Sequence, residues 1–168
     1  MPTIDEALPA VWDLEQRLDF EALVSALSSG FINLRPGEVD REIEDALRRI
    51  CEALDIDLAI LWQWSQARPD VIAPTHVYQA HQGPRPSEPM RQDLYPWTRQ
   101  QMLMGRVVAI PALEAFPAEA AVDRETLRSF GIKSAMALPL AVGGKAPIGA
   151  LGLNSLLAQR DWPDALVK

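Results

Sequence analysis

Ile132–Leu157 reads IKSAMALPLAV-GG-KAPIGALGLNSLL, two runs of apolar and small residues around the pair Gly143-Gly144. A two-residue hairpin turn requires positive φ at its central positions, and glycine adopts such angles without steric penalty. Each run is about ten residues long, at the long end of the usual strand range. Polar residues are scarce at both odd and even positions, so both faces of these strands need a cover. The stretch predicts the central hairpin of a sheet with other elements packed on each side.

Composition places the chain among soluble, folded proteins. Its 168 residues suit one domain with a substantial core, and 48% are hydrophobic while 23% are charged. The net charge of −7 is not interrupted by a basic cluster, which argues against binding to nucleic acid. The longest apolar run is far shorter than the roughly 20 residues of a membrane span. We therefore expect neither nucleic acid nor membrane as a partner.

The N-terminus and the single cysteine indicate a cytoplasmic protein. Residues 1–15 contain four acidic side chains and lack the basic start and apolar centre of a signal peptide. Cys51 is the one cysteine and cannot form an internal disulfide, which fits a reducing compartment. It lies on an apolar helical stripe, where we interpret it as a small core residue rather than a reactive thiol.

Periodicity predicts two helices and two strands before the hairpin. Apolar residues at helical spacing indicate helices over 19–31 and 38–55, the second with Pro36 in its first turn. Alternation over 58–65 predicts a strand. A second strand is predicted over 71–80, with Pro74 confining it to an edge or a bulge.

Shorter elements connect these strands to the hairpin. After a proline-rich loop we expect a helix over 92–104 closed by Gly105, a short strand over 106–112, and a helix over 124–130 with Asp123 as its N-cap and Gly131 after its end. Residues 161–168 look like the first turn of a further helix.

One sequence pattern is specific enough to suggest a family. It consists of a glycine, a basic residue, a run into Pro-Leu, a turn, and Ile-Gly-Ala-Leu, here GIKSAMALPL (131–140), Gly143-Gly144 and IGAL (148–151). Two further pieces accompany it: YPW (95–97) leading to GRVV (105–108), and AAVDRE (120–125). Together with the order of elements from residue 20 to 167, this pattern resembles a GAF domain of the type found in bacterial sensor histidine kinases and related signalling proteins.

The resemblance implies an α+β, GAF/PAS-like fold with a central antiparallel sheet of about five or six strands and helices on both faces. Residues 1–18 would be a lead-in segment, and residues 19–168 a GAF domain truncated in its C-terminal helix. The terminal helices of such domains often pair in a homodimer and pass a signal to an output domain in the same chain, such as a kinase of a two-component system.

The residues depart from two ligand-binding subsets of that family. In the cyclic-nucleotide subset an Asn-Lys pair is followed by Phe and by an Asp-Glu pair, whereas here Asn154 precedes Ser155 and Trp162 precedes Pro163. The bilin-binding subset often has a ligating cysteine near the pocket, whereas we expect Cys51 on the opposite side of the sheet. The resemblance therefore leaves the cofactor, if there is one, unknown.

Aromatic residues are the remaining candidates for a binding site, because their rings suit a planar ligand. Trp62 and Trp64 share a face of their strand, and strand parity predicts that small and apolar residues of the hairpin lie beside them. The alternative interpretation is that these side chains form ordinary core. The ligand-binding residues that we predict are Trp62, Trp64, Tyr78, Trp97, Ala137, Leu151, Leu153 and Ser155.

Catalytic and metal-binding patterns are not evident in the sequence. His76 and His81 have no recognised ligand spacing and no accompanying cysteine or carboxylate cluster. No Ser-His-Asp order, phosphate-binding loop or nucleophile elbow occurs. Redox chemistry on a methionine derivative, a third possibility for this scaffold, would need more cysteines. We expect no catalytic and no metal-binding residues.

Two hypotheses for the function follow. In the first, the domain binds a small molecule in an apolar, aromatic-walled pocket and shifts the packing of its terminal helices. In the second, it is a ligand-free dimerisation and coupling module whose pocket is filled by its own side chains. An open cavity behind Trp62 and Trp64 would favour the first hypothesis, and a packed one the second.

Overall fold

The structure is a computed structural model that describes residues 18, 21–22, 36–65, 67–68, 70–83, 86, 89–141 and 143–167. Nearly all of the lead-in segment and of the helix predicted over 19–31 lies outside these residues.

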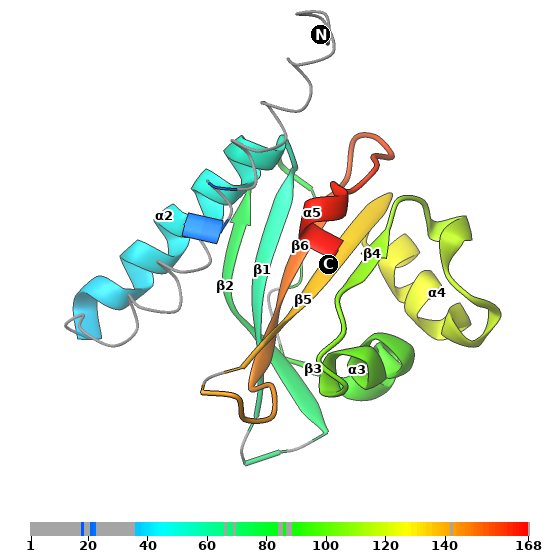
Figure 1. Ribbon diagram of the computed structural model, residues 1–168, viewed down its shortest axis with the longest axis horizontal. Coiled ribbons are helices and arrows are strands. Elements are labelled where there is room, and N and C mark those ends of the chain that lie inside the picture. Colours follow the sequence, from blue (N-terminus) through cyan, green and yellow to red (C-terminus); the bar gives the residue numbers. More distant parts are fainter. Residues whose placement is uncertain are drawn as a thin grey trace, which may run out of the picture.

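A six-stranded antiparallel sheet forms the centre of the described part of the chain (Figure 1), with strand order β3-β2-β1-β6-β5-β4. Helices cover both of its faces, which confirms the predicted α+β fold. The strands are β1 (Leu58–Trp64), β2 (Val71–Gln79), β3 (Met90–Arg91), β4 (Val108–Ile110), β5 (Ser134–Leu140) and β6 (Gly149–Ser155).

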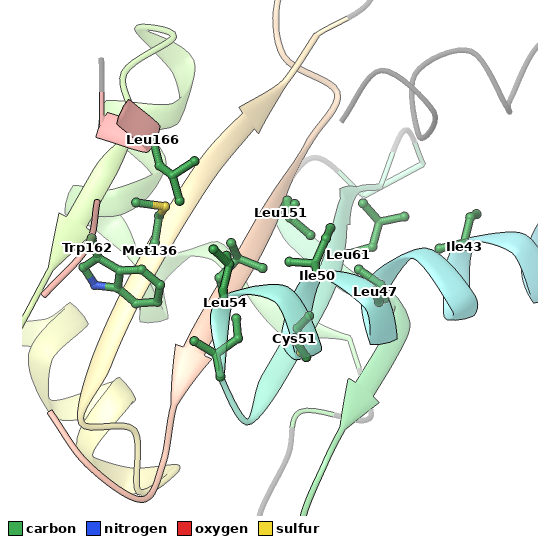
Figure 2. Packing of buried hydrophobic residues seen from close by; sticks show 13 residues of the cluster. Ile43, Leu47, Ile50, Cys51, Leu54, Leu61, Met136, Leu151, Trp162 and Leu166 are labelled. Carbon is green, nitrogen blue, oxygen red and sulfur yellow. The ribbon is translucent and has the colours of Figure 1, made fainter. Parts of the chain in front are cut away.

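Helix α2 (Pro36–Leu54) packs along one face of the sheet, as its apolar spacing predicted. Figure 2 shows Leu47 and Ile50 pointing from this helix toward Leu61 and Leu151 of the strands. Burial of each such side chain contributes roughly 1.5–3 kcal/mol. We call this the α2-side cluster; its buried members are Ile43, Leu47, Ile50, Cys51, Leu54, Ile56, Ala59, Leu61, Met136, Leu151, Leu153, Trp162 and Leu166.

The other face is covered by α3 (Pro96–Leu103), α4 (Ala121–Ser129) and three short 3-10 turns, Gln92–Leu94, Leu113–Ala115 and Ala118–Ala120. The single helix predicted over 92–104 is thus divided, and α3 begins at Pro96, whose missing N–H costs nothing in a first turn. We call the buried set on this face the α3-side cluster; it comprises Met102, Val108, Ile110, Leu113, Phe116, Ala120, Leu127, Ile132, Ala135 and Ala150.

The central hairpin differs from its prediction in the length of its turn. Its last paired residues are Leu140 and Gly149, so the connection spans residues 141–148 and the expected two-residue turn is wrong. Gly143 and Gly144 nevertheless have φ of +61° and +71°, the left-handed angles for which glycine was expected there.

Asp123 corrects a second expectation. Helix α4 begins earlier than predicted, with Ala120 at its N-cap, so Asp123 lies inside its first turn. Its fully buried carboxylate accepts hydrogen bonds from the backbone N–H groups of Trp97 (3.1 Å) and Thr98 (2.8 Å). It therefore caps the first turn of α3, whose free N–H groups need an acceptor, rather than α4.

Pro74, which has no backbone N–H to donate to a neighbouring strand, lies beside a β-bulge, as predicted. The register of β1 and β2 shifts between Leu61 and Trp62, so that Thr75 is the extra residue of a bulge beside the proline. The Thr75 hydroxyl donates to the Leu61 carbonyl at 3.2 Å.

The chain returns to the α2 side after β6. The Trp162 indole donates to the carbonyl of Ile110 in β4 at 3.1 Å, and the guanidinium of Arg160 donates to the carbonyls of Leu54 and Asp55 at the end of α2. A short helix, α5 (Asp164–Val167), follows and buries Leu166, as predicted for the last residues.

Candidate ligand pocket

A pocket lies between the sheet and the elements that cover its α3 side. Its cavity volume is about 90 Å³, enough for several water molecules. Its wall includes residues from both layers. From the sheet come Ile60, Trp62, Gln63 and Trp64 of β1, Val108 of β4, Ala135 and Ala137 of β5, and Ala150, Gly152 and Asn154 of β6; from the covering segments come Tyr95, Thr98, Arg99, Met102, Phe116 and Leu127.

Strand register explains why the space is open. Residues paired directly across an antiparallel ladder point to the same face. Trp62 pairs with Ala150, and Gly152 pairs with both Ile60 and Ala137. Large β1 side chains therefore stand beside small ones on β6 and β5.

Gly152 gives the Trp62 ring its place. A Cβ atom at Gly152 would lie 3.1 Å from Nε1 of Trp62 and 3.7 Å from Nδ2 of Asn154. Only a residue without a Cβ leaves this position free. The side-chain nitrogens of Trp62 and Asn154 therefore both lie near the backbone of Gly152, which carries no side chain.

Aromatic contacts fix the wall. The rings of Trp62 and Tyr95 meet edge to face, with centroids 6.1 Å apart, and those of Trp97 and Phe116 do so at 5.8 Å. Burial, and to a lesser extent the charge of Asp123, raises the pKa of Tyr95 above its usual value, so its hydroxyl remains a neutral donor at physiological pH.

Asn154 is the most buried polar side chain in the wall, at 5% exposure. Within the described part of the chain its carboxamide makes no hydrogen bond, and its polar atoms are not among the side-chain atoms fully closed off from solvent, so a ligand or water in the cavity can reach them.

The predicted site residues divide between the two faces. Trp62, Trp64 and Ala137 line the pocket. Trp97 is not in its wall, and packs against the α3-side cluster with its ring on Phe116.

The predicted placement of the other four is wrong. Tyr78, Leu151 and Leu153 pack in or against the α2-side cluster. Ser155 donates to the Ala158 carbonyl at 2.8 Å and to the Asp57 carboxylate at 3.3 Å. Ala137 pairs with Gly152, so the even-numbered residues of β6 share its face and the odd-numbered ones point away.

Sequence reasoning missed five polar members of the wall: Gln63, Tyr95, Thr98, Arg99 and Asn154. Correct cross-strand pairing would have placed Asn154, because it shares the parity of Ala150 and Gly152. The positions of Tyr95 and Arg99 depend on the docking of α3, which no local pattern specifies.

The cysteine and the histidines lie elsewhere. Cys51 belongs to the α2-side cluster, where burial raises the pKa of its thiol to about 12. His76 Nε2 lies 3.0 Å from an oxygen of Asp40, and His81 Nε2 lies 3.7 Å from one of Asp57. Among the described residues, no three histidine, cysteine or acidic side chains gather where they could hold a metal ion. No helix in the described ranges has the length and apolarity to cross a membrane.

Solved structures share this architecture. The phycocyanobilin-bound GAF domain of a cyanobacterial phytochrome matches with a TM-score of 0.66 and 13% identity, over 90% of this chain and 85% of that one. The blue-light-absorbing form of the PixJ GAF domain from Thermosynechococcus elongatus matches at 0.61 and 16%, over 81% and 80%. A GAF domain region from Geobacter sulfurreducens PCA matches at 0.61 and 16%, over 77% and 83%. At such identities these likenesses show the fold.

The sequence itself identifies the family. No curated protein sequence matches the chain. The family model described as GAF domain matches residues 38–167, which include every strand of the sheet and the helices on both its faces. The chain therefore belongs to the GAF domain family.

Proposed function

We propose that this chain is the sensory domain of a bacterial signalling protein, that it binds a small molecule without catalysing a reaction, and that it works in the cytoplasm. The observation that carries this proposal is the carboxamide of Asn154, which lies in the pocket wall and has no hydrogen-bond partner among the residues that the structure describes. A pocket that only completed the core would be expected to pair this group or to replace it with an apolar side chain.

The ligand-free coupling module is the second candidate. It would have the same fold and the same dimerising terminal helices, but its own side chains would fill the pocket. The cavity beside Trp62 and Trp64 favours the sensory function over this alternative.

Binding is proposed to be non-covalent. Two structural neighbours carry bilins, according to their descriptions as phycocyanobilin-bound and phycoerythrobilin-bound GAF domains. In this chain the single cysteine lies on the opposite face of the sheet, and its thiol is held neutral. A thioether bond from this chain to a ligand in the pocket is therefore not favoured, and a four-ring tetrapyrrole would need several times the present cavity.

The contacts of the C-terminal segment support a route for the signal. Val108 of β4 lines the pocket, and the carbonyl of Ile110 on the same short strand accepts the indole N–H of Trp162. Arg160, two residues earlier, holds the last carbonyls of α2. A ligand that displaced β4 would thus act on the segment leading to α5 and, we propose, to a homodimer interface and an output domain such as a histidine kinase.

Native mass spectrometry of the purified chain, beside its denatured mass, tests the function. We expect a non-covalent adduct that is lost on denaturation, and a thermal stabilisation by the same compound. Trp62→Ala should abolish that stabilisation because it removes the wall beside Asn154.

Leu157→Ala, at a side chain 64% exposed, serves as the control and should respond like the wild type. A dimer without adduct, and without thermal shift across a metabolite panel, would favour the coupling module. A folded Trp62→Ala variant with an unchanged ligand response would place the site elsewhere.

A further inference from the structure

The chemistry of the pocket wall narrows the class of ligand. Most of the wall is apolar or aromatic, and its polar groups differ in exposure. Asn154 is buried at the inner part of the pocket, whereas Arg99 is exposed and therefore lies at the mouth.

Arg99 is the only charged side chain among the described residues of the wall. Its guanidinium makes no ion pair or hydrogen bond with any residue that the structure describes. The nearest buried acid on α4, Asp123, is outside the wall and already accepts two backbone N–H groups. A cation without an ion-pair partner among the described residues, at the mouth of an apolar pocket, favours an anionic ligand group, and guanidinium pairs best with a carboxylate or phosphate.

The inner end offers hydrogen bonds to a neutral oxygen. The side-chain nitrogens of Trp62 and Asn154 converge over Gly152, at 3.1 Å and 3.7 Å from where its Cβ would be. The indole N–H can only donate, whereas the carboxamide can donate or accept. A hydroxyl oxygen in the cavity within reach of both nitrogens could accept hydrogen bonds from the indole N–H of Trp62 and from Nδ2 of Asn154.

The size of the cavity limits the body between these ends. The cavity of about 90 Å³ is smaller than the ~150 Å³ that encloses a benzene molecule, so a ligand with one ring would extend through the open mouth of the pocket. The edge-to-face pair of Trp62 and Tyr95 borders the cavity with aromatic surface. A larger fused system would require the wall to move.

We propose that the pocket binds a monocyclic aromatic carboxylate that carries a hydroxyl on the far side of its ring. The hydroxyl lies between Trp62 and Asn154, the ring lies against the aromatic wall, and the carboxylate pairs with Arg99 at the mouth. This inference rests on the proposed sensory function and gives it a ligand class.

Isothermal titration of the whole chain with three probes tests the proposal. 4-Hydroxybenzoate has both polar ends, 4-hydroxybenzamide lacks the charge, and benzoate lacks the hydroxyl. We expect 4-hydroxybenzoate to bind about tenfold or more tightly than either of the others, as the loss of a hydrogen bond to a charged or buried group implies. Added salt should weaken its binding but not that of the amide.

Three variants, two at Arg99 and one at Asn154, test which residue binds each end of the ligand. Arg99→Gln should weaken 4-hydroxybenzoate to the level of the amide, whereas Arg99→Lys, which keeps the charge, should retain part of the preference. Asn154→Ala should bring 4-hydroxybenzoate and benzoate within about twofold of each other. Arg106→Gln, at an exposed arginine just after α3, is the matched control and should change nothing.

The outcomes separate the two proposals. Equal binding of acid and amide, or an Arg99→Gln variant that binds like the wild type, would overturn the carboxylate assignment. Absence of binding by all three probes, together with a native adduct of another class, would overturn the ligand class and leave the sensory function standing. Absence of both probe binding and any adduct would overturn the sensory function as well.

Discussion

Two residues on the α3 side show how single side chains shape the pocket. Asp123 holds the first turn of α3, the helix that contributes Thr98, Arg99 and Met102 to the wall. Gly152 leaves room for the Trp62 indole on the sheet. Asp123 thus stabilises a helix that covers the pocket, and Gly152 leaves room in the pocket on the side of the sheet.

Asp123→Ala should lower the free energy of unfolding by about 2–4 kcal/mol, because two backbone N–H groups lose a charged acceptor inside the protein. Urea unfolding followed by circular dichroism measures the change. Glu119→Ala, at an exposed acid in the preceding turn, should stay within about 0.5 kcal/mol of the wild type. Equal losses in the two variants would contradict a capping role.

Gly152→Ala should close the pocket with a smaller loss of stability, about 1–2 kcal/mol, since the new methyl group pushes the Trp62 ring into the cavity. NMR of the indole N–H signals should show the displacement of that ring. The matched control is Gly37→Ala near the start of α2, where a Cβ meets nothing within 4 Å and should be neutral or slightly stabilising. An unshifted Trp62 signal would show that the floor adapts in another way.

At the scale of elements, α2 is the main support of the sheet. Its apolar stripe is buried against the strands, and its outer face carries Arg48 between Asp45 and Glu52, at 2.6 Å and 2.7 Å. These exposed ion pairs add little to stability, because solvent screens them. The buried apolar stripe of α2, which includes Cys51, contributes more to the free energy of unfolding than these ion pairs do.

Cys51 gives the α2 side a pH dependence. Folding favours the neutral thiol, whose pKa is raised from 9.0 to about 12 by burial first and by Asp57 and Glu52 next. Its contribution is complete below pH 9 and is lost as the pH rises toward 12, with a slope of at most about 1.4 kcal/mol per pH unit. Between pH 8 and 10, the wild type should lose stability in urea more steeply than Cys51→Ala. Parallel curves would show that the thiol does not contribute.

The elements differ in how far the sequence could predict them. The helix over 38–55 and the strands over 58–65 and 71–80 carry strong periodicity, and the structure has them within a residue or two at each end. The N-cap of α4 was misplaced because Asp123 bonds to a helix 25 and 26 residues earlier in the chain. Local patterns cannot express such a contact.

The pocket shows the same limit. Trp62 and Trp64 were recognisable from alternation within one strand. Leu151 and Leu153 were assigned to the wrong face because parity was carried across the hairpin without pairing the residues, whereas Ala137 faces the same side as Gly152. Arg99 becomes part of the wall only through the docking of α3, which depends on the buried acid of α4.

In the whole molecule, the C-terminal segment joins the two sides. Trp162 packs in the α2-side cluster and donates a hydrogen bond to a carbonyl of β4, one of the two edge strands of the sheet. Arg160 donates to a carbonyl at the end of α2. The exit of the described chain is thus tied both to a pocket strand and to the main helix.

Trp162→Phe keeps the ring but removes the donor to the Ile110 carbonyl. It should cost about 1–2 kcal/mol and loosen the C-terminal segment selectively. Hydrogen exchange measured by mass spectrometry should rise in residues 159–167 while that of α2 stays slow. A uniform rise across the chain would indicate a general loss of stability instead.

The position of the two clusters on opposite faces of one sheet has an evolutionary consequence. Substitutions at distant positions that share no contact partners have nearly independent effects on stability. The α2-side cluster contains most of the large, fully buried aliphatic residues, whereas the pocket floor is built from Ala135, Ala137, Ala150 and Gly152. During evolution, substitutions that add or remove one or two methyl groups at these floor positions can therefore change which ligand the pocket binds, while the α2-side cluster keeps the domain folded.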